Sequence, residues 1–299
     1  MTDRRLALTF VIPVKDGAAF LRDTLDRVWA WLVERGEPAE LLVVDDGSSD
    51  ATPTLLATFA SEVAGHQQVE LVALRNVVNR GKGYSLRRAF LHARGDRVLF
   101  TDADLTYGVD NAATVLATLD REQADIVIGS RMHDDSRYVV APNFFGKLFT
   151  RHLSGRIFNL LVRAICVPGV RDTQAGLKGF RREAAQELAT RVQLDRFSFD
   201  VELLFVARRL GLRVTACPVL FVYCKEPSTV HFVRDSLAMV RDMLRIRWRG
   251  WRGAYRQPLP PEQLAELHNG GAAATGAAIA PGPIETRRNA SPQRADRVG

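Results

Sequence analysis

Short apolar runs alternate with longer amphipathic stretches along the first half of the chain. The apolar runs cover residues 8–14, 40–44, 70–74, 97–101 and 125–129. Between them lie segments with helical spacing, at residues 18–34, 52–64, 83–93 and 109–119. Strands that alternate with helices are typical of βαβ units, in which the strands pair in parallel. The pattern therefore predicts an α/β fold with a mixed, mainly parallel sheet flanked by helices.

The second half of the chain has fewer regular elements. A helix is expected at residues 195–210 and a strand at 213–224. After Gln257 the chain becomes rich in Ala, Gly and Pro, a composition that buries little apolar surface and indicates disorder. We therefore expect a globular domain at residues 1–230, an amphipathic helix at 231–256 and a disordered tail at 257–299.

The overall composition is that of a globular protein, with 46% hydrophobic and 25% charged residues. The three cysteines, Cys166, Cys217 and Cys224, have no CxxC spacing. This speaks against a zinc site or a disulfide framework and fits a reducing, cytoplasmic compartment. The sequence also shows no signal-peptide pattern and no apolar run of roughly 18 to 20 residues, the length that spans a bilayer.

The net charge of +7 indicates an acidic partner, but charge alone does not distinguish nucleic acid, anionic lipid and a phosphorylated substrate. Much of the basic charge lies in two segments that are otherwise apolar. Residues 143–167 contain four Lys or Arg and no acid, and residues 231–256 contain seven Arg and two Asp. No nucleic-acid-binding motif accompanies these arginines, so we expect no nucleic acid partner.

The spacing within the second basic segment predicts a membrane-surface helix. Its large apolar residues recur at helical spacing with arginines beside them, at Leu237, Val240, Leu244, Trp248 and Trp251. A helix of this kind can lie in the headgroup layer of a membrane, which would make the protein peripheral on the cytoplasmic face. The alternative is that these residues pack on the sheet domain or on a second subunit, as many amphipathic helices do.

Polar side chains follow four of the predicted strands. The strand ends read Pro13-Val14-Lys15-Asp16, Asp45-Asp46-Gly47-Ser48, Asp102-Ala103-Asp104 and Gly129-Ser130-Arg131. In open parallel sheets, ligands bind outside the carboxyl ends of the strands. One carboxylate after a strand is commonly a helix cap, but four polar sites on one edge together predict a binding site.

Two features of the sequence suggest how a nucleotide would be held. Asp102 and Asp104 flank one small residue, and hard carboxylate oxygens select Mg²⁺ or Mn²⁺, which would bridge two phosphates. Lys82 lies between two glycines at the start of a helix, where backbone amides favour an anion. The alternatives are a pair of solvated loop acids and a tight loop with a solvated lysine.

Taken in this order, the motifs resemble the family-2 inverting glycosyltransferases of the GT-A fold, a Rossmann-like arrangement. The resemblance is carried by residues 11–13, 43–50, 79–83, 102–104 and 129–131. Residues 172–180 and 197–204 are more narrowly similar to the polyprenyl-phosphate branch, especially the dolichyl-phosphate glucosyltransferases, with the mannosyltransferases as cousins. The resemblance covers about residues 6–230.

The resemblance implies a donor site at the carboxyl edge of the sheet. The implied donor-binding residues are Pro13, Val14, Asp16, Asp45, Asp46, Lys82, Asp102 and Ala103. Mg²⁺ or Mn²⁺ would be held by Asp102 and Asp104. The QxxRW motif of processive family members does not occur, which argues against polymer synthesis. The N-terminal membrane anchor that dolichyl-phosphate glucosyltransferases usually carry is also not found in this sequence.

The same resemblance implies inverting transfer of a hexose, from UDP-glucose first or GDP-mannose second, to a polyprenyl phosphate. Such an acceptor is already anionic near neutral pH, so it needs cations more than a strong base. The candidate cations are Arg131, Arg171 and Lys178. The candidate catalytic residues are Asp172, Asp200 and Arg131.

Three alternatives stay open from the residues alone. Asp200 lies on a predicted helix, where a surface or capping role is as compatible with the sequence as catalysis. A soluble transferase would use a hydroxyl acceptor, for which Asp172 or Asp200 would act as the base. A nucleotide- or lipid-binding protein without catalysis is the third reading.

Overall fold

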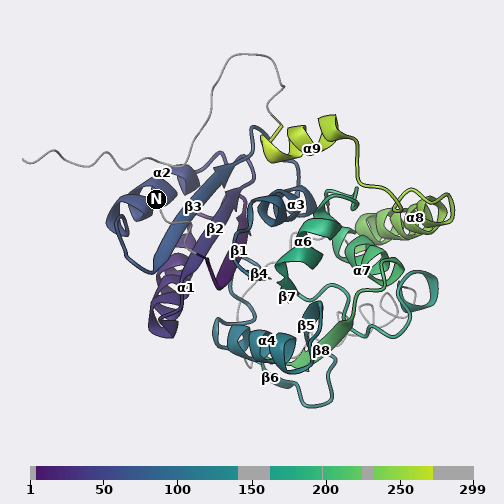
Figure 1. Cartoon of the computed structure of the whole chain (residues 1–299), viewed down its shortest axis with the longest axis horizontal. Helices are drawn as coiled ribbons and strands as arrows, with labels where there is room; N and C mark the ends of the chain where they lie inside the picture. The colour runs from purple at the N-terminus through teal and green to yellow at the C-terminus, as the bar shows by residue number, and fades with distance from the viewer. Residues whose placement is uncertain (1–4, 141–161, 197, 224–231, 272–299) are drawn as a thin grey trace, which may run out of the picture.

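The computed structural model describes residues 5–140, 162–196, 198–223 and 232–271 (Figure 1). Its first half alternates strands and helices, as the hydrophobic pattern predicts. The strands are β1 (Leu8–Val14), β2 (Ala39–Asp45), β3 (Val69–Arg75), β4 (Arg97–Thr101) and β5 (Ile126–Ser130). The helices between them are α1 (Leu21–Arg35), α2 (Thr52–Glu62), α3 (Lys82–His92) and α4 (Asp110–Arg121). Each predicted strand agrees with the observed one to within one residue at either end.

The main sheet has seven strands in the order β3-β2-β1-β4-β7-β5-β8. All pairings are parallel except those of β7 (Leu177–Arg181), which lies antiparallel between β4 and β5. The chain runs outward from β1 through β2 and β3 and then returns to β4, on the other side of β1. This reversal makes the gap between the ends of β1 and β4 a topological switch point, where ligands of open α/β sheets bind.

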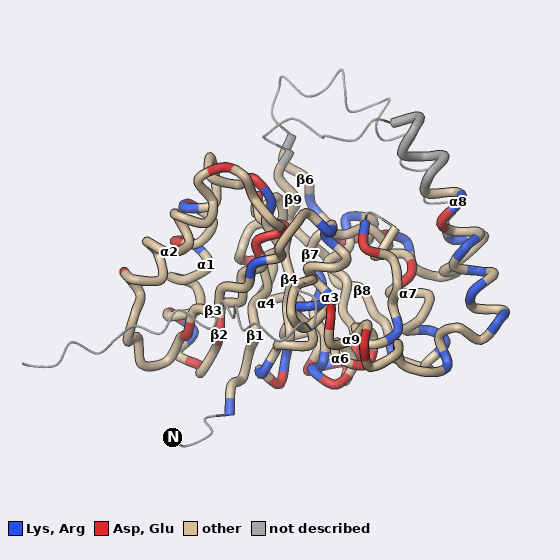
Figure 2. The backbone as a smooth tube through the Cα atoms, turned by 90° about the horizontal axis from the view of Figure 1, so that it is seen from above, with Lys and Arg blue, Asp and Glu red and all other residues tan. Residues whose placement is uncertain are grey.

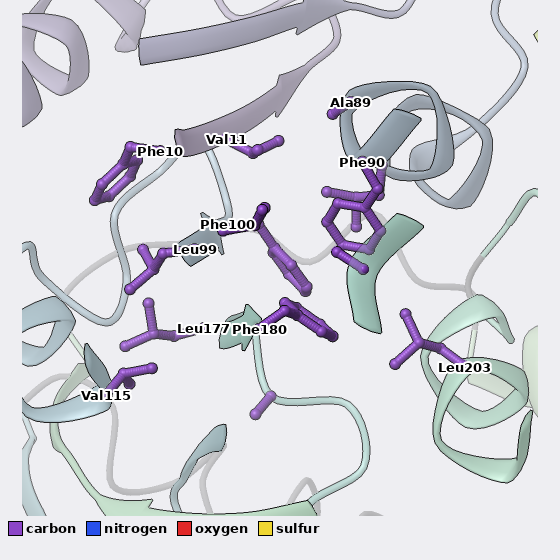
Figure 3. Close-up of a cluster of buried hydrophobic side chains, with 14 of the residues drawn as sticks. Phe10, Val11, Ala89, Phe90, Leu99, Phe100, Val115, Leu177, Phe180 and Leu203 are labelled. Carbon is purple, nitrogen blue, oxygen red and sulfur yellow. The ribbon is translucent and has the colours of Figure 1, made fainter. Parts of the chain in front are cut away.

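Helices cover both faces of the sheet, which explains why its central strands are apolar throughout. On one face, Phe10 of β1 packs edge-on against Trp31 of α1, with ring centroids 5.8 Å apart. On the other face, Phe180 of β7 packs against Phe90 of α3, with centroids 5.0 Å apart, and against Phe100 of β4 (Figure 3). This second cluster fixes α3 over β4, so that the helix begins beside the end of that strand.

The second half of the chain differs more from expectation. The strand predicted at 213–224 is two strands, β8 (Val214–Pro218) in the main sheet and β9 (Leu220–Tyr223) in another. β9 pairs in parallel with β6 (Arg137–Val140) to form a separate two-stranded sheet. The remaining helices are α6 (Arg182–Ala189), α7 (Phe199–Arg209), α8 (Phe232–Trp251) and α9 (Pro261–His268).

Within the basic segment predicted at 231–256, the structure has helix α8 over residues 232–251, and this helix lies next to α7 (Figure 1). Of the basic segment predicted at 143–167, residues 143–161 lie outside the described part of the chain. Among the helices that the structure describes, none is both long and apolar enough to cross a bilayer.

The prediction of a disordered tail from residue 257 is wrong for residues 257–271. Helix α9 begins with Pro261 in its first turn and buries Leu267 to 1% exposure. Backbone carbonyls of α9 accept hydrogen bonds from Tyr84 and Arg88 of α3. A helix of eight residues with so few apolar contacts leaves little periodicity in the sequence, because its order depends on polar groups of another helix. Residues 272–299 lie outside the described residues.

Candidate active site

The loops after β1 and β2 are hydrogen-bonded to each other at the switch point. The backbone N–H of Asp46 donates to the Val14 carbonyl at 2.8 Å, and that of Asp16 donates to the Ser48 hydroxyl at 2.8 Å. The loop after β4 lies on the other side of β1, and there the N–H of Asp102 donates to the Gly176 carbonyl at 3.2 Å. The sequence prediction that the carboxyl ends of these strands form one polar edge is therefore confirmed.

Asp16 is an exposed carboxylate with its own counterion. Its φ of 48° is left-handed, and its Oδ1 accepts a hydrogen bond from the Ser49 N–H at 2.8 Å. Lys15 lies 2.5 Å from Oδ2, and this hydrogen bond is the main reason why the pKa of Asp16 is lowered to about 2. The carboxylate is therefore charged throughout the physiological range.

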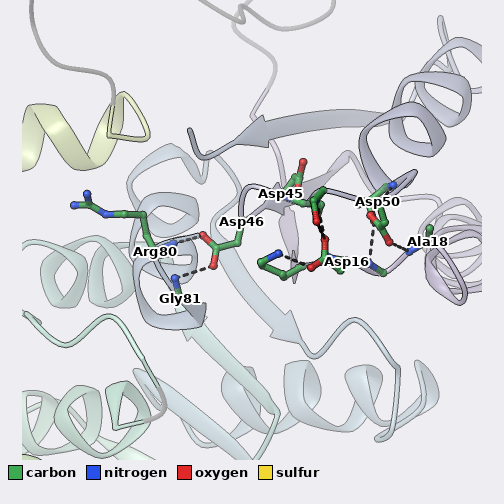
Figure 4. A network of polar contacts seen from close by, with 12 residues as sticks. Asp16, Ala18, Asp45, Asp46, Asp50, Arg80 and Gly81 are labelled. Atoms are coloured by element: carbon green, nitrogen blue, oxygen red, sulfur yellow. Dashed lines mark hydrogen bonds and ion pairs between the residues drawn. The ribbon is translucent and has the colours of Figure 1, made fainter. Parts of the chain in front are cut away.

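Asp45 and Asp46 serve mainly to shape loops. Asp45 is buried, accepts a hydrogen bond from the Ser48 N–H at 2.9 Å and pairs with Arg75. Asp46 accepts hydrogen bonds from the backbone N–H groups of Arg80 and Gly81, at 2.8 and 2.7 Å (Figure 4). Gly81 has a φ of 103°, and a Cβ there would lie 2.4 Å from the Asp195 carbonyl oxygen, so the loop requires glycine. Asp46 thus holds the loop that leads into Lys82.

Lys82 lies between two carboxylates. Its Nζ is 2.6 Å from Asp102 Oδ1 and 4.0 Å from Asp200 Oδ2, and it sits 5.3 Å from the centroid of the Phe100 ring. Burial by itself lowers the pKa of the Lys82 ammonium, but the two carboxylates outweigh burial and the pKa is raised. The lysine is therefore a fixed positive charge at the N-terminus of α3, where an anionic ligand is already favoured.

Asp200 and Lys178 form a buried ion pair behind Lys82. Lys178 is 0% exposed, and its Nζ donates to Asp200 Oδ1 at 2.6 Å and to the Ala175 carbonyl at 2.7 Å. Burial lowers the pKa of Lys178. The prediction that Lys178 contacts an acceptor phosphate does not fit this geometry, because the enclosed ammonium already has two protein partners. The alternative of a surface or capping role for Asp200 is also wrong, since the carboxylate is buried at the site.

Arg131 and Asp172 form a second ion pair. The backbone N–H, Nε and Nη2 of Arg131 each donate to the Asp172 carboxylate at 2.9 Å. Burial raises the pKa of Asp172, but the hydrogen bonds and charge of Arg131 outweigh it, so the pKa is lowered. The guanidinium also lies over the Phe221 ring, 5.5 Å from its centroid. Asp172 therefore orients Arg131 and is poorly suited to act as a base.

Arg171 lies on the other side of Asp172. Its guanidinium is 2.9 Å from Asp134 Oδ1, and both residues line a cavity of about 320 Å³ together with Asp172 and His133. Lys82 and Asp102 do not line this cavity. The structure thus separates the three predicted acceptor cations: Arg131 lies over the Phe221 ring, Arg171 lines the cavity, and Lys178 is enclosed.

Two residues of the site were not predicted. A Cβ on Gly176 would lie 2.0 Å from Asp102 Oδ2 and 3.2 Å from the Tyr107 ring, so Gly176 lets both side chains approach its backbone. Tyr107 is buried and lies 6.0 Å from the Arg131 guanidinium, which links the Asp102 region to the Arg131 pair. The sequence signal for Gly176 was present, because this glycine lies within the 172–180 stretch that carried the resemblance.

Asp102 and Asp104 fit a divalent cation that keeps other ligands. The Asp102 side chain is 38% exposed, and Asp104 is exposed and accepts one hydrogen bond from the Thr106 N–H. Within the described residues, no group of three or more His, Cys, Asp or Glu side chains could enclose a metal. The protein therefore offers two carboxylates, which suits Mg²⁺ or Mn²⁺ because these ions usually retain water and substrate phosphates.

Comparison with known proteins agrees with this geometry. Residues 9–189 match the model of the family described as Glycosyl transferase family 2. A dolichyl-phosphate beta-glucosyltransferase of Drosophila melanogaster is 33% identical over 84% of this chain and 77% of its own length.

Two solved structures share the fold, which confirms the GT-A prediction. Glucosyl-3-phosphoglycerate synthase from Mycobacterium tuberculosis with UDP has a TM-score of 0.57 at 19% identity, over 81% of this chain and 80% of that one. A mannosyltransferase from Pyrobaculum calidifontis with GDP-Man and Mn²⁺ has a TM-score of 0.52 at 22% identity, over 90% and 70%. Because the family match spans more than half of its residues, the chain belongs to glycosyl transferase family 2 and is a glycosyltransferase.

Proposed function

We propose that this glycosyltransferase moves glucose from UDP-glucose to a polyprenyl phosphate, with inversion, at the cytoplasmic face of a membrane. The observation that carries the proposal is the row of charges at the switch point, in which Lys82 Nζ lies 2.6 Å from Asp102 Oδ1 and 4.0 Å from Asp200 Oδ2. The relatives named dolichyl-phosphate beta-glucosyltransferase support glucose as the sugar and a polyprenyl phosphate as the acceptor.

The donor half of the site has the parts that departure of a diphosphate requires. Asp102 and Asp104 would hold Mg²⁺ or Mn²⁺, and the bound ion supplies positive charge that stabilises the leaving diphosphate. Lys82 adds a fixed ammonium beside Asp102, and Asp200 with its partner Lys178 keeps that ammonium in place. Fixed charges of this kind stabilise a transition state without reorganising during the reaction.

The nucleoside side of the pocket would lie at the ends of β1, β2 and β4. Its residues would be Pro13, Val14, Asp16, Asp45, Asp46 and the small Ala103. The exposed Asp16 is available to a ligand, whereas Asp46 acts through the loop at residues 80–82 that it holds. UDP-glucose is favoured over GDP-mannose by the glucosyltransferase relatives. The neighbour crystallised with GDP-Man indicates that the same fold also accommodates guanine nucleotides.

The acceptor half of the site uses cations in place of a base. A phosphate oxygen is already anionic near neutral pH, so the transfer needs orientation and charge compensation. Arg131 and Arg171 would share that task. Asp172 orients the guanidinium of Arg131, and Arg171 lines the neighbouring cavity. Asp172 contributes by fixing Arg131, and Asp200 contributes by fixing the two lysines.

A panel of donors and acceptors tests the proposal. The purified chain is incubated with radiolabelled UDP-glucose or GDP-mannose, Mn²⁺ and a short polyprenyl phosphate. Lipid product is counted in the organic phase, and water-soluble product is separated from the donor by thin-layer chromatography and counted as well. We expect lipid-linked glucose from UDP-glucose and a loss of product with Asp102→Asn. The matched acceptors are the corresponding polyprenol and 3-phosphoglycerate. Product on either of these, with none on the polyprenyl phosphate, contradicts the assigned acceptor, and donor binding without any transfer or hydrolysis contradicts the catalytic assignment.

A further inference from the structure

The side chains of α8 that the structure describes, from residue 239 onward, divide into two faces. Met243 and Ile246 are buried, and a Cβ on Gly250 would lie 2.6 Å from the Phe205 ring of α7. These residues share one side of the helix and pack it onto the transferase domain. The apolar residues of α8 therefore form two groups, and only the group that contains Met243 and Ile246 packs inside the domain.

The other apolar component faces outward. Leu244, Trp248 and Trp251 are 59%, 54% and 82% exposed. Their spacing of four and three residues places them along one stripe of the helix surface. Contiguous, exposed, large apolar side chains mark a surface that a membrane or another molecule covers. The sequence alternative in which these three residues pack on the sheet domain is thus wrong.

The charged residues of α8 separate in the same way. Asp242 accepts a hydrogen bond from Ser198 at 2.7 Å, and Arg249 lies 3.6 Å from the buried Glu202, so both point toward the domain. The arginines that flank the exposed stripe are Arg241, Arg245, Arg247 and Arg252, and all four are exposed. Figure 2 shows this concentration of basic residues along the described part of α8. The outward face is therefore apolar at its centre and positive at its margins.

We propose that this outward face of α8, formed by Leu244, Trp248, Trp251 and the four arginines around them, docks the protein on an anionic lipid bilayer. Tryptophan favours the boundary between headgroups and acyl chains, and arginine favours anionic headgroups. A second copy of this chain fits less well, because pairing two such faces would bring eight arginines together. This docking proposal rests on the proposed function, since a polyprenyl phosphate acceptor would reach the site from a membrane.

Vesicle flotation of the full chain, without donor or acceptor, tests this surface. Phosphatidylcholine vesicles are compared with vesicles that also contain phosphatidylglycerol, at low and high salt. We expect binding to the anionic vesicles that weakens with salt. Trp248→Ser with Trp251→Ser, and separately Arg241→Glu with Arg245→Glu, should each lower the partition coefficient roughly tenfold or more. These residues are exposed, so thermal unfolding should be unchanged.

The matched control is Arg27→Glu with Arg121→Glu, which removes two exposed arginines from α1 and α4 and should bind vesicles as the unmodified chain does. Equal partition of the control and both α8 variants overturns the proposal, as does a dimer that the α8 variants abolish without lipid. Transfer to a water-soluble short-chain acceptor separates the two hypotheses. If vesicle binding depends on α8 but no acceptor is glucosylated, the proposed function fails while the docking surface stands.

Discussion

The ammonium of Lys82 lies 2.6 Å from Oδ1 of Asp102, the carboxylate expected to hold the metal. This pairing gives the carboxylate a counterion that belongs to the protein. Asp102 would therefore hold a divalent cation only in competition with the Lys82 ammonium. Asp200, whose Oδ2 lies 4.0 Å from the Lys82 Nζ, would keep the ammonium in place at the start of α3 when Asp102 binds a metal.

Lys82→Met is expected to separate metal affinity from catalysis. Removal of the competing cation should tighten Mn²⁺ binding to the nucleotide-free protein, by roughly tenfold. Transfer should fall by roughly a hundredfold or more, because the leaving diphosphate loses a fixed positive charge. Mn²⁺ binding is measured by electron paramagnetic resonance and transfer by product formation. Lys82→Arg, which keeps the charge, is the control and should recover part of the activity; a Met variant with weaker metal binding would contradict the competition.

Gly176→Ala is expected to move Asp102. The new Cβ would lie 2.0 Å from Oδ2 of that carboxylate, too close for either group to stay in place. We expect transfer to fall roughly tenfold or more, with a raised Mn²⁺ requirement, because a displaced ligand binds the ion less well. Gly179→Ala, on strand β7 just after Gly176, is the control, since its Cβ would meet the end of the Val115 side chain. That variant should lose stability without changing the metal requirement; equal metal requirements in both variants would refute the role assigned to Gly176.

The central strands of the sheet and the polar edge were predictable because each leaves a local signal. Buried parallel strands such as β1 and β2 are apolar on both faces, and the carboxylates that follow them mark the ligand edge directly. β7 was not predicted as a strand. It contains Lys178 and two other polar or small positions within five residues, and it becomes a strand only because β4 and β5 flank it.

The partners of the site residues were beyond prediction for a related reason. Lys178 fits a buried position only with Asp200, which lies 22 residues away on α7. Asp46 is a donor-site residue by motif, yet its oxygens are engaged by the amides of residues 80 and 81. Such pairings depend on three-dimensional proximity, and a pattern of residue types along one chain does not encode which buried charges meet.

Asp200→Asn is expected to destabilise the fold as well as reduce transfer. It leaves the buried ammonium of Lys178 without the carboxylate that pairs with it, which costs about 3–5 kcal/mol for a broken buried ion pair. Replacing both members, with Lys178→Met and Asp200→Leu, should recover most of that free energy of unfolding, because no buried charge remains. Urea unfolding measures both. Transfer should stay low in the double variant, since Lys82 loses its second carboxylate; full activity there would show that the pair serves stability alone.

His92 of α3 contacts α9 and makes the stability of the fold depend on pH. Its ring stacks on that of His268 with centroids 4.0 Å apart, and its Nδ1 lies 2.8 Å from the Arg88 carbonyl oxygen. Burial is the main cause that lowers the pKa of His92 from 6.5 to about 4. The unfolded chain therefore takes up a proton at a higher pH than the folded one. The contribution of His92 to stability is complete above pH 6.5 and is lost as the pH falls toward 4.

His92→Phe removes this titration while keeping a ring against His268. We expect the free energy of unfolding of the unmodified chain to fall by about 1–2 kcal/mol more than that of the variant across this pH window, after allowance for solvent screening. Urea unfolding at several pH values measures the difference. Hydrogen exchange locates this difference. A charge on the buried His92 ring is unfavourable in its contact with α9, so the amides of residues 264–271 should exchange faster at the acid end in the unmodified chain alone. Parallel pH curves for the two proteins would show that the stack carries no such linkage.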